Sequence, residues 1–353
     1  MEDVDPKRRL LVAAAGIAAA LPFTRISAAT AQGASQSTPD TIRGTHTSFG
    51  TIKQIDAGDL NIGYADVGPA DGKPVVLLHG WPYDIHCYVD VAPQLAKAGY
   101  RVIVPYVRGY GSTKFRSDSA MRNAQQGAVA ADVIALMDAL KIKSAVVGGC
   151  DWGARSAAIV AALWPERCEA LVAVSGYLIG SQALNKGPLP PKAELLWWYQ
   201  YYFATERGLL GYQKYTKEFA RLVWEQASPK WAFDDATFER SATAFANPDH
   251  VAVSVHNYRW RLGLAEGEAK YDDIEKKLAS FPNINVPSIT LEGDANGAPH
   301  PEPSVYAKKF SGKYQHRTLT GGIGHNLPQE APLAFSQAVI DADNLRVQTQ
   351  LIQ

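Results

Sequence analysis

Short runs of apolar residues recur along the chain, and stretches with apolar positions at helical spacing separate them. The clearest helical pattern runs from Ala128 to Leu140. Because the apolar runs are continuous rather than alternating, we expect strands that are buried on both faces. The pattern predicts an α/β fold with a mostly parallel central sheet and helices on both faces. The runs are VVLLHG (75–80), RVIVPYV (101–107), SAVVGG (144–149) and ALVAVSG (170–176).

The pattern changes after these strands. Residues 178–279 contain most of the tryptophans, many tyrosines and several helical stretches, such as WWYQYYF. The strand pattern then resumes with SITLEGD and HRTLT. We therefore expect a core made of residues 46–177 and 280–345, with residues 178–279 inserted after the sixth strand as a helical cap. Such a cap would cover the carboxyl edge of the sheet, where open α/β sheets bind ligands. Residues 346–353 are expected to form a tail.

The beginning of the chain differs from the rest. Residues 7–9 are basic, residues 10–23 are apolar and rich in alanine, and an A-x-A motif follows at 29–31. This layout predicts an export signal over residues 1–31, in an apolar run too short for a good membrane span. The arginine pair resembles a twin-arginine signal and points to the periplasm, while an ordinary secretory signal or an uncleaved anchor is the alternative. Residues 32–45 are polar and read as a disordered leader.

Charge and cysteine content narrow the function classes. The 353 residues carry 35 basic and 35 acidic side chains, and no basic run suggests nucleic acid. An odd number of cysteines allows at most one disulfide, and their spacing fits no zinc site. We expect Cys87, Cys150 and Cys168 to be small buried residues.

The segment VVGGCDWGAR reads as a strand, a sharp turn and a helix of small residues. Cys150 and Asp151 are its two candidate nucleophiles. Strand and helix nearly touch at such an elbow, so the residues two before and two after the nucleophile must be small. For Cys150 the later position is Trp152, whose indole would not fit. For Asp151 the positions are Gly149 and Gly153, which favours Asp151 as the nucleophile.

Two further groups follow in the order nucleophile, acid, histidine. Asp294 ends the strand SITLEGD, and His325 lies in the loop GGIGHNLPQEAP. We expect the Asp294 carboxylate to orient the imidazole of His325. An oxyanion hole needs two backbone N–H groups, which we assign to Trp152 and to Trp81 of the loop LLHGWP. The peptide before Pro82 is a candidate for the cis form.

These elements resemble the α/β-hydrolase fold over about residues 46–345. Within it, G-x-D-W-G, HGWP, RGYGST and GHNLPQEAP resemble the epoxide hydrolases and their relatives, the haloalkane dehalogenases. The resemblance implies that Asp151 attacks a saturated carbon and forms an ester, which water activated by His325 then hydrolyses. It implies no cofactor and no metal. Three features depart from the family pattern, namely Cys150, Tyr83 and the segment 105–108.

The leaving group separates the two families. In epoxide hydrolases two cap tyrosines polarise the epoxide oxygen, and the motifs YQYYF and HNYR match them with Tyr199 and Tyr258. Tyr201 and Tyr202 are the alternatives if the helical frame is shifted. A halide would instead need indole N–H donors, and dehalogenases tend to carry Asn or Glu where Trp81 stands.

The resemblance therefore implies an epoxide hydrolase that converts a small apolar epoxide and water to a vicinal diol. Trp81, Trp152, Tyr199 and Tyr258 would bind the substrate. A dehalogenase with the same Asp-His-Asp triad is the alternative, and an inactive binding protein on the same fold is a third hypothesis. We expect no nucleic-acid partner and no membrane association of the mature form, and a homodimer is left open.

Overall fold

The computed structural model describes residues 47–350. The predicted export signal and the polar leader lie outside the described residues. No helix in the described range is long and apolar enough to cross a membrane.

Nine strands of the described part of the chain form one sheet in the order β1-β2-β4-β3-β6-β7-β8-β9, and β5 pairs with β2. Strand β2 pairs antiparallel with β1, β4 and β5. The pairs from β4 through β3 to β9 are all parallel, as the continuous apolar runs predict. The strands are β1 (Lys53–Ala57), β2 (Leu60–Val67), β3 (Lys73–Leu78), β4 (Tyr100–Pro105), β5 (Lys114–Phe115), β6 (Ala145–Gly149), β7 (Cys168–Val174), β8 (Ser288–Gly293) and β9 (Tyr314–Leu319).

Successive residues of the central strands enter two separate hydrophobic clusters, one on each face of the sheet. On β3, Val75 and Leu77 belong to one cluster, and Val76 and Leu78 belong to the other. Side chains alternate across a strand, so a sheet covered on both sides requires an apolar residue at every position. This is why the strand segments read as unbroken apolar runs.

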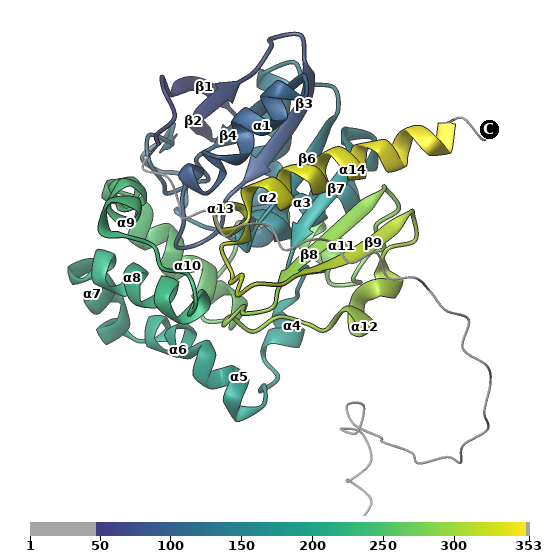
Figure 1. The fold of residues 1–353 in the computed structure, drawn as a ribbon. Helices are drawn as coiled ribbons and strands as arrows, with labels where there is room; N and C mark the ends of the chain where they lie inside the picture. Colours follow the sequence, from purple (N-terminus) through teal and green to yellow (C-terminus); the bar gives the residue numbers. More distant parts are fainter. Residues whose placement is uncertain (1–46, 351–353) are drawn as a thin grey trace, which may run out of the picture. The chain divides into compact units, whose positions relative to one another are not determined.

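Helices cover both faces of the sheet, as Figure 1 shows. Helices α1 and α14 pack against each other and against strands β4, β7 and β8, while α2 and α3 pack together on the opposite face. Helix α14 includes residues 346–350, which the sequence analysis assigned to a tail. The core helices are α1 (Val91–Lys97), α2 (Gln126–Ala139), α3 (Trp152–Leu163), α12 (Pro303–Tyr306), α13 (Leu327–Glu330) and α14 (Pro332–Gln350).

The chain between β7 and β8 is helical, and its helices α5 to α10 lie beyond one end of the strands (Figure 1). The strand before this cap is the predicted one, but it is seventh in chain order because the short strand β5 precedes it. The helices are α4 (Gln182–Asn185), α5 (Pro191–Leu196), α6 (Trp198–Ala204), α7 (Glu206–Lys214), α8 (Thr216–Ala227), α9 (Asp235–Ala242), α10 (His250–Arg261) and α11 (Asp272–Leu278).

Candidate active site

The turn between β6 and α3 has the close packing that the glycine spacing predicts. A Cβ atom on Gly149 would lie 2.2 Å from the carbonyl carbon of Gly153, and one on Gly153 would lie 1.8 Å from the carbonyl oxygen of Leu78. Asp151 has a φ of 54° and a ψ of −118°, in the left-handed region that non-glycine residues rarely adopt. The strained backbone holds the Asp151 carboxylate at the carboxyl edge of the sheet.

The loop after β3 supplies one donor to this carboxylate. The Trp81 amide donates to Oδ1 of Asp151 at 2.9 Å, which is the position that the predicted oxyanion-hole donor requires. Gly80 lies in the same loop, and a Cβ atom added to it would lie 2.4 Å from the Cβ atom of Asp151. A side chain at position 80 would therefore collide with Asp151. The Trp81–Pro82 peptide is cis, as anticipated. Within residues 47–350 the Trp152 amide makes no hydrogen bond to Asp151, so the second predicted donor is not engaged.

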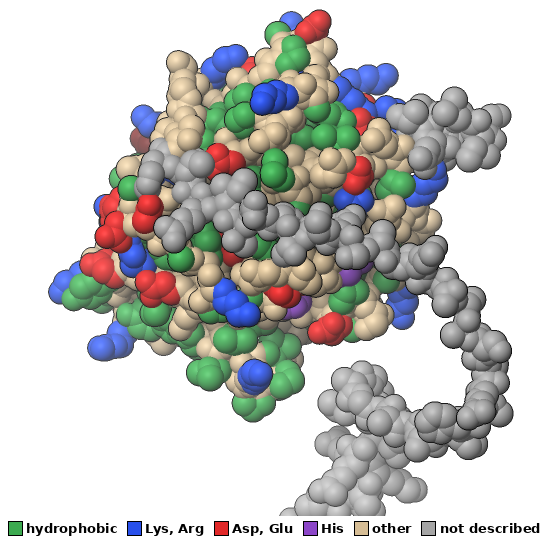
Figure 2. Space-filling model, viewed as in Figure 1, with side chains coloured by type: hydrophobic (Ala, Val, Ile, Leu, Met, Phe, Trp, Pro, Cys, Tyr) green, Lys and Arg blue, Asp and Glu red, His purple; other side chains and the backbone are tan. Residues whose placement is uncertain are grey.

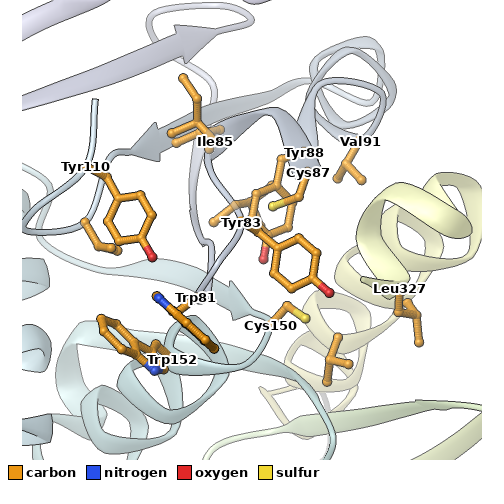
Figure 3. Close-up of a cluster of buried hydrophobic side chains, with 14 of the residues drawn as sticks. Trp81, Tyr83, Ile85, Cys87, Tyr88, Val91, Tyr110, Cys150, Trp152 and Leu327 are labelled. Carbon is orange, nitrogen blue, oxygen red and sulfur yellow. The ribbon is translucent and has the colours of Figure 1, made fainter. Parts of the chain in front are cut away.

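Cys150 is buried in the hydrophobic core beside Tyr83 (Figure 3). Its thiol donates to the carbonyl oxygen of His325 at 3.3 Å. Burial raises the pKa of the thiol well above its usual range, so the reactive thiolate is not available at neutral pH. Cys150 therefore joins the elbow to the histidine loop and is no competitor for the role of nucleophile. Cys87 and Cys168 are likewise buried and free.

His325 faces the nucleophile. Its Nε2 lies 3.8 Å from Oδ2 of Asp151. Burial lowers the pKa of His325, but the neighbouring Asp151 carboxylate outweighs burial, so the pKa lies above its usual range. Burial likewise raises the pKa of Asp151, but the opposing charge of His325 makes the net shift downward. The free protein thus favours a carboxylate beside an imidazolium.

The backbone of the histidine loop is held by the cap. Ser228, at the C-terminal end of α8, accepts hydrogen bonds from the amides of His325 at 3.0 Å and Asn326 at 3.3 Å. Its hydroxyl donates to Glu330 at 2.7 Å, and the same carboxylate accepts from the Gly324 amide at 2.6 Å. The position of the imidazole therefore depends on a residue of the inserted segment as well as on the core.

Asp294 does not orient His325, so that prediction is wrong for this structure. The Asp294 carboxylate is exposed and accepts hydrogen bonds from three backbone amides of the loop before His325, those of Gly321, Gly322 and Ile323. Nδ1 of His325 is buried and has no hydrogen-bond partner within residues 47–350. The chain turns after β8 so that the Asp294 carboxylate holds the loop before His325 in place. It forms no hydrogen bond with the imidazole of His325.

Glu292 is a carboxylate that the sequence analysis missed. It lies on β8, is 8% exposed, and its negative charge contributes to the raised pKa of His325. Its Oε1 accepts hydrogen bonds from the Asn296 side chain at 2.7 Å and the Gly293 amide at 3.1 Å. An acidic residue inside a strand of the central sheet was the available signal, since such a residue is rarely buried without a reason.

Tyr199 of α6 and Tyr258 of α10 meet opposite Asp151, as expected. Their rings lie 5.3 Å apart, and both line the cavity that contains Asp151 and His325. Burial, helped by the charge of Asp151, raises the pKa of each hydroxyl above its usual range. Both hydroxyls therefore remain protonated at neutral pH and can donate hydrogen bonds.

The two alternative tyrosines do not join this pair, because Tyr201 lies at the exposed rim of the cavity and Tyr202 is outside its lining. Tyr201 is 48% exposed, and its hydroxyl bonds to Glu194. Tyr202 stacks on Phe219, and its hydroxyl approaches Gly211 so closely that a Cβ there would lie 1.9 Å away. The helical frame of α6 thus directs Tyr199, and not Tyr202, into the cavity.

Trp81 is fixed by a chain of hydrogen bonds. Its indole N–H donates to the Tyr212 hydroxyl at 3.0 Å, which donates to Nε2 of His250 at 2.9 Å. Nδ1 of His250 donates to the Gly109 carbonyl at 3.0 Å, and burial lowers the pKa of this histidine to about 4, so it is neutral. Trp81 lines the cavity as predicted. Trp152 does not line it, because its indole is buried against Tyr258 at the start of α3.

The cavity has a volume of about 570 Å³, and most of its lining surface is apolar. Apolar side chains are exposed around α4 and α5 at its rim, including Leu184 and Leu189, and gather over α5 at the lower end of Figure 2. Two arginines that the sequence analysis did not single out, Arg155 and Arg261, also line it. Arg155 stands out within the small-residue helix after the elbow, which was the available signal.

Comparison with known proteins places this geometry in a family. Residues 73–243 match the family model described as alpha/beta hydrolase fold. The structure is similar to that of a proposed epoxide hydrolase from Klebsiella pneumoniae, with 63% identity, 83% of this chain and 97% of that chain covered, and a TM-score of 0.83.

Curated relatives give the same picture over shorter stretches. Epoxide hydrolase B of Mycobacterium tuberculosis is 36% identical over 160 residues, 41% of this chain and 44% of that protein. A haloalkane dehalogenase of Mycobacterium marinum is 29% identical over 218 residues, 59% of this chain and 70% of that protein. The match with the first of these spans less than half its length. The chain belongs to the α/β-hydrolase fold family, and these relatives are hydrolases.

Proposed function

We propose that this protein is an epoxide hydrolase that uses Asp151 as its nucleophile. The observation that carries the proposal is the pair of buried, protonated tyrosines, Tyr199 and Tyr258, which lines one cavity with Asp151 and His325. A strained ether needs a donor to its oxygen while a nucleophile attacks its carbon, and these groups supply both. The similarity to proteins described as epoxide hydrolases supports the same assignment.

In the first half-reaction, Oδ2 of Asp151 attacks an epoxide carbon. The Trp81 amide holds Oδ1, so Oδ2 is the free oxygen. A new C–O ester bond forms, the C–O bond of the epoxide breaks, and its electron pair remains on the epoxide oxygen. The hydroxyls of Tyr199 and Tyr258 stabilise that oxygen, and one of them gives it a proton.

In the second half-reaction, His325 removes a proton from water, and the oxygen attacks the carbonyl carbon of the Asp151 ester. Formation of the ester removes the carboxylate charge that raises the pKa of His325. The imidazole then becomes a free base at the step that needs one. The Trp81 amide stabilises the oxyanion. Collapse breaks the C–O bond to the substrate, and the departing oxygen takes the proton of the new acid, which releases the diol and returns the carboxylate. The imidazolium gives its proton back to the tyrosinate through solvent, so both groups are restored.

We assign the role of supporting carboxylate to Glu292. Its charge acts on His325, whereas Asp294 is saturated by loop amides. Glu292 stabilises the imidazolium that forms when His325 takes a proton from water. The sequence analysis had assigned this role to Asp294.

The proposal is tested by incubating the purified protein with an epoxide and with a bromoalkane of the same chain length, and by measuring diol and bromide separately. Diol formation that is lost in Asp151→Ala supports an epoxide hydrolase. Bromide release without diol would identify a dehalogenase instead. A halide site would need free indole N–H donors. The Trp152 indole has no hydrogen-bond partner within residues 47–350 but does not line the cavity, and the Trp81 indole is already engaged by Tyr212.

We also propose that the enzyme acts after export, on the strength of residues 1–31. Cell fractionation of the full chain and of an Arg8→Lys, Arg9→Lys double variant tests this. The twin-arginine route predicts periplasmic protein for the first and cytoplasmic accumulation for the second.

A further inference from the structure

The cavity wall carries two guanidinium groups that the proposed epoxide chemistry does not use. Arg155 lies on α3 four residues after Asp151, one helical turn further along the same face. Arg261 is the last residue of α10, which also carries Tyr258. Both arginines line the cavity that contains the nucleophile.

Arg155 lacks the partners that a buried arginine normally has. Arg108 is 1% exposed, and it donates to both oxygens of Asp132 at 2.7 Å and to Asn123 at 2.6 Å. Arg155 is 8% exposed, yet no side chain or carbonyl within residues 47–350 forms a hydrogen bond or ion pair with its guanidinium. A charge buried in this way is costly unless something else pairs with it.

The second arginine adds to this charge. The Arg261 guanidinium lies 5.3 Å from the ring of Trp197 and 5.9 Å from that of Tyr258. Burial and the positive charge of Arg261 lower the pKa of Arg155 to about 10, so Arg155 remains charged at neutral pH. The two groups repel each other, and an anion between them would relieve that repulsion.

The acidic groups near these arginines are already engaged. Glu275 accepts from the Gly127 amide at 2.8 Å and the Gln126 side chain at 3.0 Å. Glu194 is bound by the Tyr201 hydroxyl and accepts from the Leu189 amide at 2.6 Å. Asp151 balances Arg155 electrostatically in the free protein, but it loses its charge when it becomes an ester.

We propose that the epoxide substrate carries a carboxylate, which Arg155 and Arg261 bind while the epoxide ring lies at Asp151. The inference rests on the proposed function and names its substrate class. Guanidinium groups bind carboxylates strongly and with defined geometry. The aromatic rings and the apolar rim accommodate the hydrocarbon part, so the substrate is amphiphilic and not simply apolar.

The test compares 3-phenyloxirane-2-carboxylate with its primary amide, which has nearly the same shape and no charge. We expect kcat/KM of the wild-type protein to favour the carboxylate by about 100-fold, as for a buried charge-assisted pair. Arg155→Gln and Arg261→Gln should each lower this ratio by about tenfold or more, chiefly by slowing the carboxylate. Arg155→Lys, which keeps the charge, should retain part of the preference and controls for folding.

Arg207→Gln is the matched control, because it removes the same charge from an exposed position of the cap. It should leave the ratio unchanged. Equal turnover of the carboxylate and the amide by the wild-type protein would overturn the inference and leave the epoxide hydrolase standing.

If neither compound yields a diol, calorimetry with the unreactive 3-phenylpropanoate separates the two proposals. Binding that Arg155→Gln abolishes would support the anion site although the proposed function fails. The absence of binding to the wild-type protein would overturn the anion site as well.

Discussion

Asp151 and Asp294 both follow a parallel strand at the carboxyl edge of the sheet, yet their environments are opposite. Asp151 sits on a strained turn, and one of its oxygens accepts from the Trp81 amide while the other faces His325 and the cavity. Asp294 is exposed, and three loop amides share its two oxygens. A carboxylate with one oxygen that accepts no backbone hydrogen bond can act as a nucleophile. A carboxylate whose two oxygens both accept hydrogen bonds from backbone amides instead holds a loop in place. The hydrogen bonds, and not the position at a strand end, separate the two roles.

The largest effect is expected at the elbow. Asp151→Ala removes the attacking oxygen and should lower kcat for an epoxide by at least about 10⁴-fold, as removal of a catalytic group does in other triads. Steady-state diol formation measures this, and circular dichroism checks that the variant is folded. Residual activity within tenfold of the wild type would mean that another group attacks.

The next effect isolates the two half-reactions. His325→Gln should still form the ester but hydrolyse it about 10³-fold more slowly, because the base for water is missing. Mass spectrometry of the digested variant should find the mass of the substrate on the peptide that carries Asp151. An adduct on Cys150 would contradict the elbow assignment.

A smaller effect separates the two carboxylates on and after β8. Glu292→Gln should slow hydrolysis of the ester by about tenfold, because a charge that stabilises the imidazolium is lost. Asp294→Asn should change kcat by less than about threefold, as an exposed side chain that only fastens a loop. Stopped-flow measurement of ester decay compares them, and the reverse order would restore Asp294 as the supporting acid.

The smallest effect is a change in titration. Because the Asp151 carboxylate raises the pKa of His325, Asp151→Ala should lower the pKa of this imidazole, so that it loses its proton at a lower pH. Asp294→Asn should leave it where it is in the wild type. Proton NMR titration measures both, with His325→Gln used to assign the signal. If the pKa of His325 fell equally in both variants, Asp151 and Asp294 would act on the imidazole alike, and the proposed difference between the two carboxylates would be wrong.

The sequence was sufficient where chemistry depends on steric spacing. Gly149 and Gly153 identify Asp151 because a strand-to-helix turn has no room for side chains at those positions. Such constraints act between residues close in the chain, and local sequence reports them directly. Tyr199 was assigned by the resemblance of YQYYF to a family motif, and the sequence left Tyr201 and Tyr202 open as alternatives.

The sequence failed where the outcome depends on side chains far apart in the chain. The sequence placed Asp294 correctly at the end of strand β8. The three backbone amides that donate hydrogen bonds to its carboxylate lie 27 to 29 residues later in the chain. Arg155 stands out in the sequence as the one charged residue of a small-residue helix, but only the folded cap shows that its guanidinium has no partner within residues 47–350. Local pattern cannot report which polar atoms the distant chain leaves unsatisfied.

The hydrogen bonds from the His325 and Asn326 amides to Ser228 have a consequence for recombination within the family. Exchanging the cap between relatives is an obvious way to change which molecules enter the cavity. Here a graft that ends before Ser228 keeps the anchor of the catalytic base, and one that replaces Ser228 with an apolar residue removes it. A chimaera could therefore accept a new substrate, become alkylated once and then stall, so the useful crossover point lies on the N-terminal side of this serine.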